Sequence, residues 1–487
     1  MTGRELLVTA AVTAPSVTAA AILIVPRRAV STVAVIGLLT SAAAALAAAV
    51  VALAQPASRL VGTWVVLDPA AGVILATVAF VGVGALLVSP SYLRDHPTGL
   101  VRTRQGARLY YAALACFWAL LVAVPLAGNL GAAWLVIEGT TAVSALLVGF
   151  TGSPRALEAG WKYLLLTSLG LGFSLLAIVI LESDAKSASV ASLSWHALGD
   201  VPRSQQLTLV AYLLLLVGFA AKVGWAPVHN WLPDAHSEAP PPISALLSGS
   251  LLPAVAIVAW RASDALAVPI GGTTTQSTLI AFGLLSLAVA VPFLWRALAW
   301  KRLLAYSSLE HMGVVAIGIG FGTPLALAGV IVHIGGHALA KALGFWTAGP
   351  LLEHEPRAGE RPARGVARTA PSLGGSMGIS LGALAGLPPS PLFVSELMIV
   401  AGGFSAGRYW EASATTILLA LGFLGLAQAL VQILAGPVRS TRSGPIAGLR
   451  PVLALTAATT GLLLALAVGA LWLPASSVVD ALVKGLS

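Results

Sequence analysis

The chain has 487 residues, of which 58% are hydrophobic and only 9% charged, and its mean hydropathy is +0.92. Soluble proteins carry about a quarter charged residues, so this composition excludes a soluble globular enzyme and indicates an integral membrane protein. The formal net charge of +9 does not indicate a nucleic-acid partner, because the basic residues follow a membrane-topology pattern along the chain.

Apolar runs long enough to span a bilayer recur from one end of the chain to the other. Each helix needs roughly 20 residues to cross about 30 Å of hydrocarbon. The first run lacks a basic leader and is interpreted as a retained helix rather than a signal peptide. We therefore predict an all-α polytopic membrane protein. Its fourteen transmembrane helices begin near Glu5, Val30, Leu67, Leu109, Leu130, Lys162, Leu207, Ile243, Thr278, Leu303, Pro324, Leu373, Ala414 and Leu453.

The distribution of Lys and Arg predicts the orientation of these helices. If successive helices alternate across the bilayer, the connections after odd-numbered helices hold 18 of the basic residues and the opposite side holds 7. The positive-inside rule then places the odd connections in the cytoplasm and both termini outside the cell, in a multi-pass protein of the plasma membrane. The 18 are Arg27, Arg28, Arg94, Arg102, Arg104, Arg108, Arg155, Lys162, Arg296, Lys301, Arg302, Arg357, Arg361, Arg364, Arg368, Arg439, Arg442 and Arg450; the 7 are Arg4, Arg59, Lys186, Arg203, Arg261, Arg408 and Lys484.

Cys116 is the only cysteine, and it lies inside an apolar run. A single cysteine excludes an intrachain disulfide and a cysteine-ligated iron–sulfur cluster within this chain. We therefore expect no cofactor and no redox chemistry in the chain itself. Any iron–sulfur, nickel–iron or flavin group would belong to a partner subunit.

Several ionisable residues lie within the predicted membrane spans. A charged side chain at the bilayer centre costs about 2.5 to 3.5 kcal/mol on insertion scales, so each is by default a functional candidate. The histidines among them titrate near neutral pH. In chain order the candidates are Glu138 in the fifth helix, Lys222 in the seventh, His311 in the tenth, His333, His337 and Lys341 in the eleventh, and Glu396 in the twelfth.

Pro227, shortly after Lys222, predicts a break in the seventh helix. Proline removes a helical hydrogen bond, and freed backbone at membrane depth must be packed in protein or line a wet cavity. Burial disfavours the charged form of a lysine and a nearby carboxylate favours it. A hydrated break beside Lys222, with Glu138 as a switchable counter-charge, would make a proton station. The structural alternative is that Lys222 and Glu138 pair only to hold the helices together.

Pro388 and Pro389 predict a second break, in the twelfth helix. Two breaks that lie five helices apart indicate a duplicated unit, and an odd offset inverts the second copy, as in many transporters. We predict two inverted five-helix repeats, at 109–262 for helices 4 to 8 and 276–436 for helices 9 to 13. Residues 1–108 hold helices 1 to 3, and 450–487 hold helix 14 and the C-terminus.

Two groups of side chains could form a metal site, but neither is favoured. His333 and His337 have the i, i+4 spacing of a helical metal pair, but no third ligand lies on the same face. His229, His236 and the neighbouring acids Asp234 and Glu238 are grouped among prolines at a helix end, where capping and loop-ordering roles are commoner. We therefore predict no metal site.

The stretch from Lys222 to Gly249, KVGWAPVHNWLPDAHSEAPPPISALLSG, resembles the antiporter-like subunits of respiratory complex I, Mrp sodium/proton antiporters and membrane-bound hydrogenases. The resemblance extends through KRLLAYSSLEHMG, HALAKALGFWTAG and GLPPSPLFVSE. Within that family VIEGTTAVSALLVGF, LEAGWKYLLLTS and SSLEHMG are most similar to component F of hydrogenase-4-type complexes. The family resemblance covers the chain from the fifth to the twelfth predicted helix.

The resemblance implies a polar axis across the membrane midplane, built from Glu138 paired to Lys222, then Lys341 and Glu396, with His229, His311, His333 and His337 linking half-channels. One departure from the family pattern concerns the eighth helix. Several family members carry a lysine there, where this chain reads SGSLLPAVAIVAW with Pro253 close by. Water, His229 or His311 would then have to link the two halves.

The leading hypothesis is a proton-translocating membrane subunit of a hydrogenase-4-like or complex I-like redox-driven pump. Its expected partners are other membrane subunits and peripheral redox subunits in the lipid bilayer. The alternative is a subunit of an Mrp-type antiporter that exchanges sodium for protons without a redox partner. A scaffold that has lost transport, and a metalloenzyme built on the residues near His229, are two further alternatives.

Overall fold

The computed structural model describes residues 2–55, 60–95, 103, 105–185, 190–438, 444–472 and 479. Residues 473–478 and 480–487 of the predicted C-terminal segment lie outside the described residues. So do seven of the basic residues used for the topology prediction, namely Arg59, Arg102, Arg104, Lys186, Arg439, Arg442 and Lys484.

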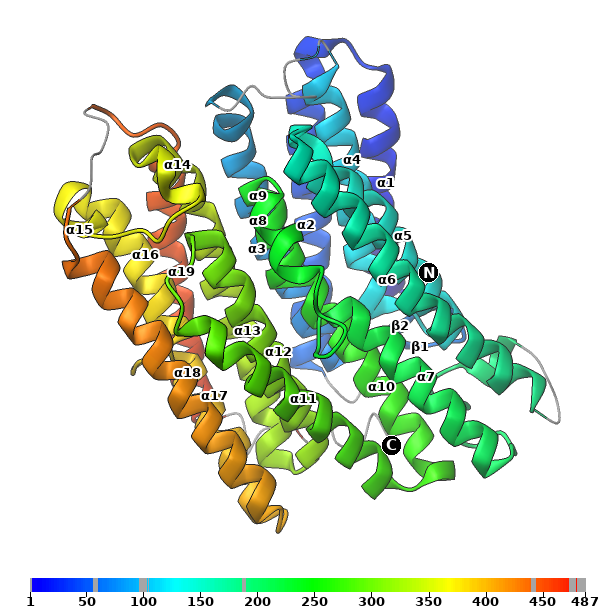
Figure 1. Cartoon of the computed structure of the whole chain (residues 1–487). Coiled ribbons are helices and arrows are strands. Elements are labelled where there is room, and N and C mark those ends of the chain that lie inside the picture. The colour runs from blue at the N-terminus through cyan, green and yellow to red at the C-terminus, as the bar shows by residue number, and fades with distance from the viewer. Residues whose placement is uncertain are drawn as a thin grey trace.

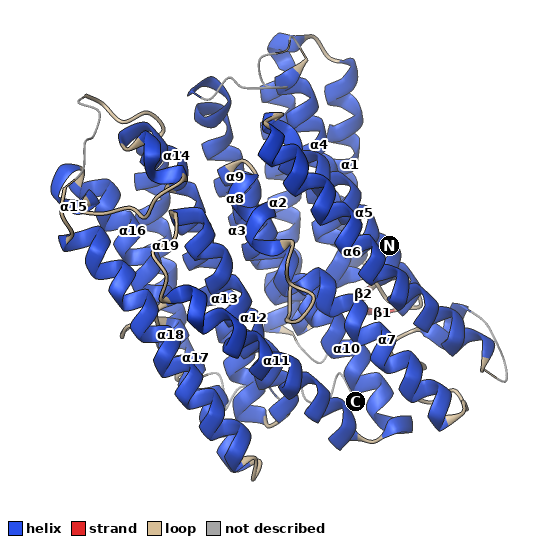
Figure 2. Cartoon of the chain, in the orientation of Figure 1, coloured by secondary structure: helices blue, strands red, loops and turns tan. Residues whose placement is uncertain are grey.

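Almost all of the described chain is helical, which confirms the predicted all-α fold (Figure 2). One short antiparallel strand pair, β1 (Leu60–Val61) with β2 (Val66–Leu67), precedes the third span. The helices are α1 Gly3–Ile24, α2 Val30–Ala54, α3 Pro69–Asp95, α4 Gly106–Leu126, α5 Leu130–Val148, α6 Pro154–Ser183, α7 Gln205–Val223, α8 Leu232–Glu238, α9 Pro241–Leu246, α10 Leu252–Ile270, α11 Gly272–Leu294, α12 Trp300–Phe321, α13 Pro324–Trp346, α14 Ala348–His354, α15 Val366–Thr369, α16 Pro371–Leu384, α17 Pro391–Ser405, α18 Tyr409–Ala435 and α19 Leu449–Ala470.

Thirteen helical segments among the described residues are long and apolar enough to cross a membrane. The remaining predicted span is the twelfth, which is divided into α16 and α17 and is therefore not continuous. The largest difference in a helix start concerns α6, predicted near Lys162 and observed from Pro154. Ser153 explains it, because its side chain accepts a hydrogen bond from the Ala156 amide and Pro154 fits the first helical turn.

Both predicted helix breaks are present. The seventh span ends as α7 at Val223 and resumes as α8, with Pro227 between them, and Pro388 and Pro389 separate α16 from α17. Each break contains one cis X–Pro peptide bond. The repeat boundaries predicted from these breaks remain a prediction.

The eighth span is continuous but irregular. It runs through α9, a π-helical turn at Leu247–Leu251 and α10. Pro253 follows the turn and has no amide hydrogen to donate to the preceding turn, which favours a wider helical turn there. Gly249 in this turn lets α13 approach, since a Cβ on it would lie 3.2 Å from the Ala338 carbonyl oxygen.

The helix α13 lies at the centre of the bundle. It packs against α3 and α9 on one side and against α16, α17 and α19 on the other. Figure 1 shows the early helices, such as α1 and α4, on one flank and α15 to α18 on the opposite flank. Every residue of α12 except Lys301 and Arg302 is buried. Side chains on α12 and α13 are therefore shielded by both halves of the chain.

A buried ion pair joins α10 to the start of α3. Arg261 Nη2 donates to Asp68 Oδ1 at 2.9 Å, and Arg261 Nη1 donates to the Pro125 carbonyl at 2.7 Å. Asp68 also accepts from the Ala71 amide at 2.7 Å. Removing the guanidinium would leave a buried carboxylate without its counter-charge, which costs about 3 to 5 kcal/mol.

We therefore expect Arg261→Met to lower the thermal unfolding temperature of the protein in mild detergent. Arg408→Met is the matched control, because Arg408 forms only a short-range pair with Glu411 near the surface. An unfolding temperature equal to that of the control would contradict a structural role for the buried pair.

Candidate functional site: buried ionisable side chains

Lys222 is completely buried in the last turn of α7. Its ammonium donates to Thr141 Oγ1 of α5 and to the Tyr163 hydroxyl of α6, both at 2.6 Å. It also lies 4.8 Å from the centroid of the Tyr163 ring. These contacts offset part of the cost of placing an amine in an apolar interior.

Glu138 lies one helical turn before Thr141 on α5. One of its carboxylate oxygens accepts a hydrogen bond from Ser168 Oγ at 2.6 Å, and the other, Oε2, is buried with no hydrogen-bond partner. The ion pairs of the described residues do not include one between Glu138 and Lys222. The Glu138 carboxylate and the Lys222 ammonium interact electrostatically without direct contact. The hydrogen bond to Thr141 links Lys222 to α5.

The break after Lys222 is closed by protein groups. The indole nitrogen of Trp231 donates to the Ala221 carbonyl at 2.6 Å, and that of Trp225 donates to the Met312 carbonyl at 2.7 Å. The Ala226 amide donates to Ser286 Oγ at 3.0 Å. The Ala221 carbonyl and the Ala226 amide at the break are thus satisfied by tryptophan and serine side chains. The hydration of the break remains a prediction.

Lys341 on α13 repeats the arrangement of Lys222 in the second half. It is completely buried, and its ammonium donates to the Leu304 carbonyl at 2.6 Å and to Ser307 Oγ, both on α12. Ser307 lies one turn before Glu310, as Thr141 lies one turn after Glu138. Each lysine is thus held by a hydroxyl group one helical turn from a glutamate.

Glu310 is a candidate that the sequence analysis missed. Its side chain is 3% exposed, its Oε2 has no hydrogen-bond partner, and it interacts electrostatically with Lys341. The sequence did carry a signal for it, because Glu310 lies beside His311 inside the predicted tenth span. The carboxylate rests against α18, because a Cβ added to Gly422 would lie 1.9 Å from Glu310 Oε1.

His311 of α12 and the two histidines of α13 form a contiguous group. His333 and His337 lie one turn apart on α13, and His337 lies one turn before Lys341. His311 Nδ1 is 3.1 Å from His333 Nε2, and the His311 and His337 rings are 5.2 Å apart. Both ring nitrogens of His337 are buried without a hydrogen-bond partner.

A serine fixes the tautomer of His333. Ser395 Oγ donates to the Leu392 carbonyl, so it can only accept from His333 Nδ1, at 3.0 Å. His333 Nε2 therefore carries a lone pair and accepts from His311 Nδ1. Glu396, the next residue on α17, places its carboxylate in the same group, within 4.8 Å of the donor atoms of both histidines.

His236 on α8 lies between the two halves. It is completely buried, its Nδ1 is 3.0 Å from the Leu232 carbonyl, and its Nε2 has no partner. It interacts electrostatically with Lys341. His229, which was also predicted to lie on the pathway, is half-buried in the break. The Trp231 ring contacts both neighbouring rings: its centroid lies 4.7 Å from that of Tyr163 and 6.1 Å from that of His236.

The residues near His229 do not converge on one point. Asp234 pairs with Arg302 at 3.1 Å and lies 3.9 Å from Lys162. Among the described residues, one group of three potential metal ligands is present, and it consists of His311, His333 and Glu396. The alternative metal site near His229 has no support from this geometry.

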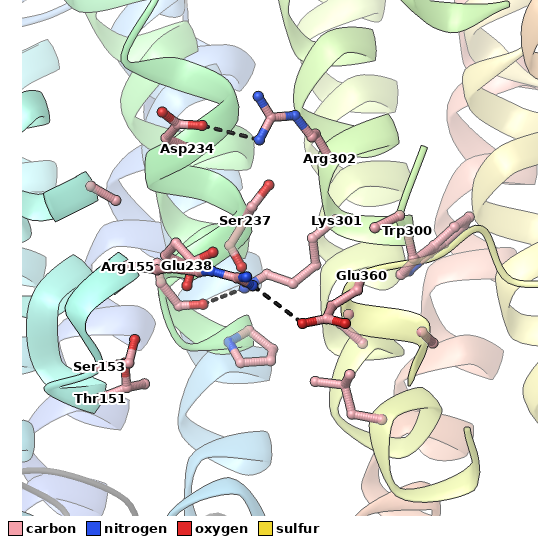
Figure 3. A pocket seen from close by; sticks show the side chains of 18 of the residues that line it. Thr151, Ser153, Arg155, Asp234, Ser237, Glu238, Trp300, Lys301, Arg302 and Glu360 are labelled. Atoms are coloured by element: carbon pink, nitrogen blue, oxygen red, sulfur yellow. Dashed lines mark hydrogen bonds and ion pairs between the residues drawn. The ribbon is translucent and has the colours of Figure 1, made fainter. Parts of the chain in front are cut away.

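A cavity of about 900 Å³ opens where α8 ends (Figure 3). It is lined by the connections after the fifth, ninth and eleventh spans, which places these three odd connections at one end of the bundle. Lys301 donates to the Ser237 carbonyl at 2.6 Å and to the Ala239 carbonyl, which satisfies the free carbonyls at the end of α8. Arg155 and Glu360 pair across the cavity at 3.3 Å.

Residues 127–422 match the family described as "NADH:quinone oxidoreductase/Mrp antiporter, TM". The match contains every predicted site residue from Glu138 to Glu396. The hydrogenase-4 component F homolog of Methylacidiphilum infernorum is 30% identical over 397 residues, which cover 80% of this chain and 82% of that protein.

Two solved structures have a similar fold. One is a chain of the membrane-bound sulfane sulfur reductase, an archaeal respiratory membrane complex, with a TM-score of 0.84 and 18% identity over 99% of this chain and 97% of that one. The other is a chain of the Mrp complex from Dietzia sp., with a TM-score of 0.82 and 18% identity over 100% and 98%. At this identity the likeness concerns the fold.

Proposed function

Because this chain belongs to the family of transmembrane subunits shared by NADH:quinone oxidoreductases and Mrp antiporters, we propose that it translocates protons within a redox-driven, hydrogenase-4-like or complex I-like membrane complex. Its similarity to a hydrogenase-4 component F homolog favours this over the antiporter alternative. The electron-carrying cofactors of such a complex would be held by partner subunits.

The observation that carries the proposal is the histidine segment, which we define as His236, His337, Lys341, His311, His333 and Glu396. Its members are buried, except for a partly exposed Glu396, and they come from α8, α12, α13 and α17. The 3.1 Å contact between His311 and His333 is a proton-sharing distance between two neutral imidazoles. Groups of this kind inside a membrane mark proton relays in pumps.

The proposed source of protons for the segment is the cavity at the end of α8. Ser237 and Lys301 line this cavity, and Ser237 is the residue next to His236 along the chain. The partly exposed Glu396 side chain is the proposed exit for protons from this segment. The positive-inside rule assigns the cavity to the cytoplasm and both termini to the outside of the plasma membrane.

The group around Lys222, made of Glu138, Thr141, Tyr163 and Lys222, is a second and separate station. Trp231 stands between it and His236, and no lysine of the eighth span fills that gap. We infer that the two stations influence each other through their charges rather than by a direct proton hop. Loss of the Lys222 charge would then change the electrostatic potential at His236 and Lys341.

The Mrp-type antiporter remains the second candidate, since a chain of an Mrp complex has the same fold. The test uses the native complex, purified in mild detergent and reconstituted in vesicles. We expect lumen acidification when an electron donor and acceptor are supplied, with iron-containing partner subunits identified by mass spectrometry and metal analysis. Proton movement that follows an imposed sodium gradient, without any electron donor, would replace the proposal by the antiporter.

A further inference from the structure

We propose that His311, His333 and Glu396 form an inhibitory binding site for a zinc ion. The three side chains come from α12, α13 and α17, and their donor atoms all lie within 4.8 Å of one another. The sequence predicted no metal site because the i, i+4 pair of His333 and His337 lacked a third ligand on its own helix. The missing ligands come from the helices packed against α13.

The donor set suits zinc. Two imidazoles and one carboxylate, with an open fourth position, are a common zinc environment. Zinc–nitrogen bonds of about 2.0 to 2.1 Å in a tetrahedral site separate the two nitrogens by roughly 3.3 Å. His311 Nδ1 and His333 Nε2 are already 3.1 Å apart. The two nitrogens are therefore already at about the separation of a tetrahedral site, and each ring would turn to direct its lone pair at an ion beside the line that joins them.

The surroundings also orient the ligands. Ser395 accepts from His333 Nδ1 and so directs the lone pair of Nε2 toward His311. An outer partner of this kind fixes the tautomer of metal-ligating histidines. His311 Nε2 has no hydrogen-bond partner. His311 can thus carry its proton on Nε2 and present Nδ1 to the metal without breaking another bond.

Glu396 is the point of access. Both histidines are buried, whereas Glu396 is partly exposed. Its carboxylate lies over the break before α17, where a Cβ on Gly386 would lie 2.9 Å from Glu396 Oε2. A cation that approaches this break meets the carboxylate first and the imidazoles behind it. The inhibitory effect, unlike binding itself, rests on the proposed proton-translocating function.

Binding is tested on the purified complex with Co²⁺ as the probe. A tetrahedral Co²⁺ site gives a strong visible absorption band, which Zn²⁺ should abolish by competition. We expect His333→Gln and Glu396→Gln complexes each to lose this band and about one equivalent of zinc per complex relative to wild type, as removal of one of three ligands predicts. His354→Gln is the control, because His354 contacts Thr369 away from the site.

The two mutants guard against a failure of folding, since either one that assembles is sufficient. Retention of the Co²⁺ band and of the zinc equivalent in an assembled mutant would overturn the site. Zinc binding without any loss of proton translocation in wild-type vesicles would overturn the inhibitory role. A complex that binds zinc at this site but never moves protons would leave the site intact and refute the proposed function.

Discussion

We expect the replacement of Lys222 by Met to reduce proton translocation by about 100-fold or more, the scale on which a positioned proton-transfer group contributes. We also expect the complex to stay assembled. Thr141 and Tyr163 keep other hydrogen-bond partners, namely the Ile137 carbonyl and Ser144, so neither hydroxyl is left unsatisfied. Glu138 is partly exposed, so loss of the lysine does not leave a fully buried carboxylate behind. The cost in stability is therefore expected to be smaller than that of breaking a fully buried ion pair.

The measurement is donor-driven acidification of inverted vesicles, with the amount of assembled complex determined on native gels. Arg408→Met serves as the control for the loss of a positive charge outside the site. Glu138→Gln should show the same loss of translocation as Lys222→Met. Normal translocation in both mutants would leave this station with a packing role only.

Replacing Lys341 by Met also abolishes translocation, but here the expected cost in stability is larger. Glu310 is buried and interacts with the Lys341 ammonium, so the single mutant leaves a carboxylate without its counter-charge. Loss of one of two coupled buried charges is destabilising, whereas loss of both is often neutral. We expect Lys341→Met to lower the unfolding temperature and Lys341→Met/Glu310→Gln to restore it.

The readout is a double-mutant cycle of unfolding temperatures in detergent, completed by Glu310→Gln alone. The restored double mutant should still fail to translocate protons, which separates the role of the charges in transport from their role in stability. Additive effects in the cycle would mean that Glu310 and Lys341 are not coupled, and the parallel with Glu138 and Lys222 would be lost.

The sequence was a sufficient guide to the spans and to their breaks. Long apolar runs with prolines at 227, 388 and 389 have few other interpretations in a bilayer, and both breaks were found where they were predicted. The start of α6 was missed because its Ser153 cap and Pro154 precede the apolar run rather than belong to it. The π-helical turn before Pro253 was missed because no residue type demands one.

The site was predictable only one helix at a time. Lys222, Lys341 and the histidines stand out as polar residues in apolar runs, and their family resemblance supports them. What they contact depends on the neighbouring helices, which their own sequence does not reveal. His236 was grouped with loop residues for that reason. The meeting of His311 and Glu396 at His333 is likewise a consequence of tertiary packing.

The contact between Gly422 and Glu310 gives α18 a mechanical significance. This helix lies on the flank of the bundle, and most of its surface is not buried by the chain. Its backbone nevertheless forms the wall against which a buried carboxylate rests, with no room for even a methyl group between them. A displacement of α18 toward the bundle by a fraction of an ångström would therefore press its backbone against the buried Glu310 carboxylate.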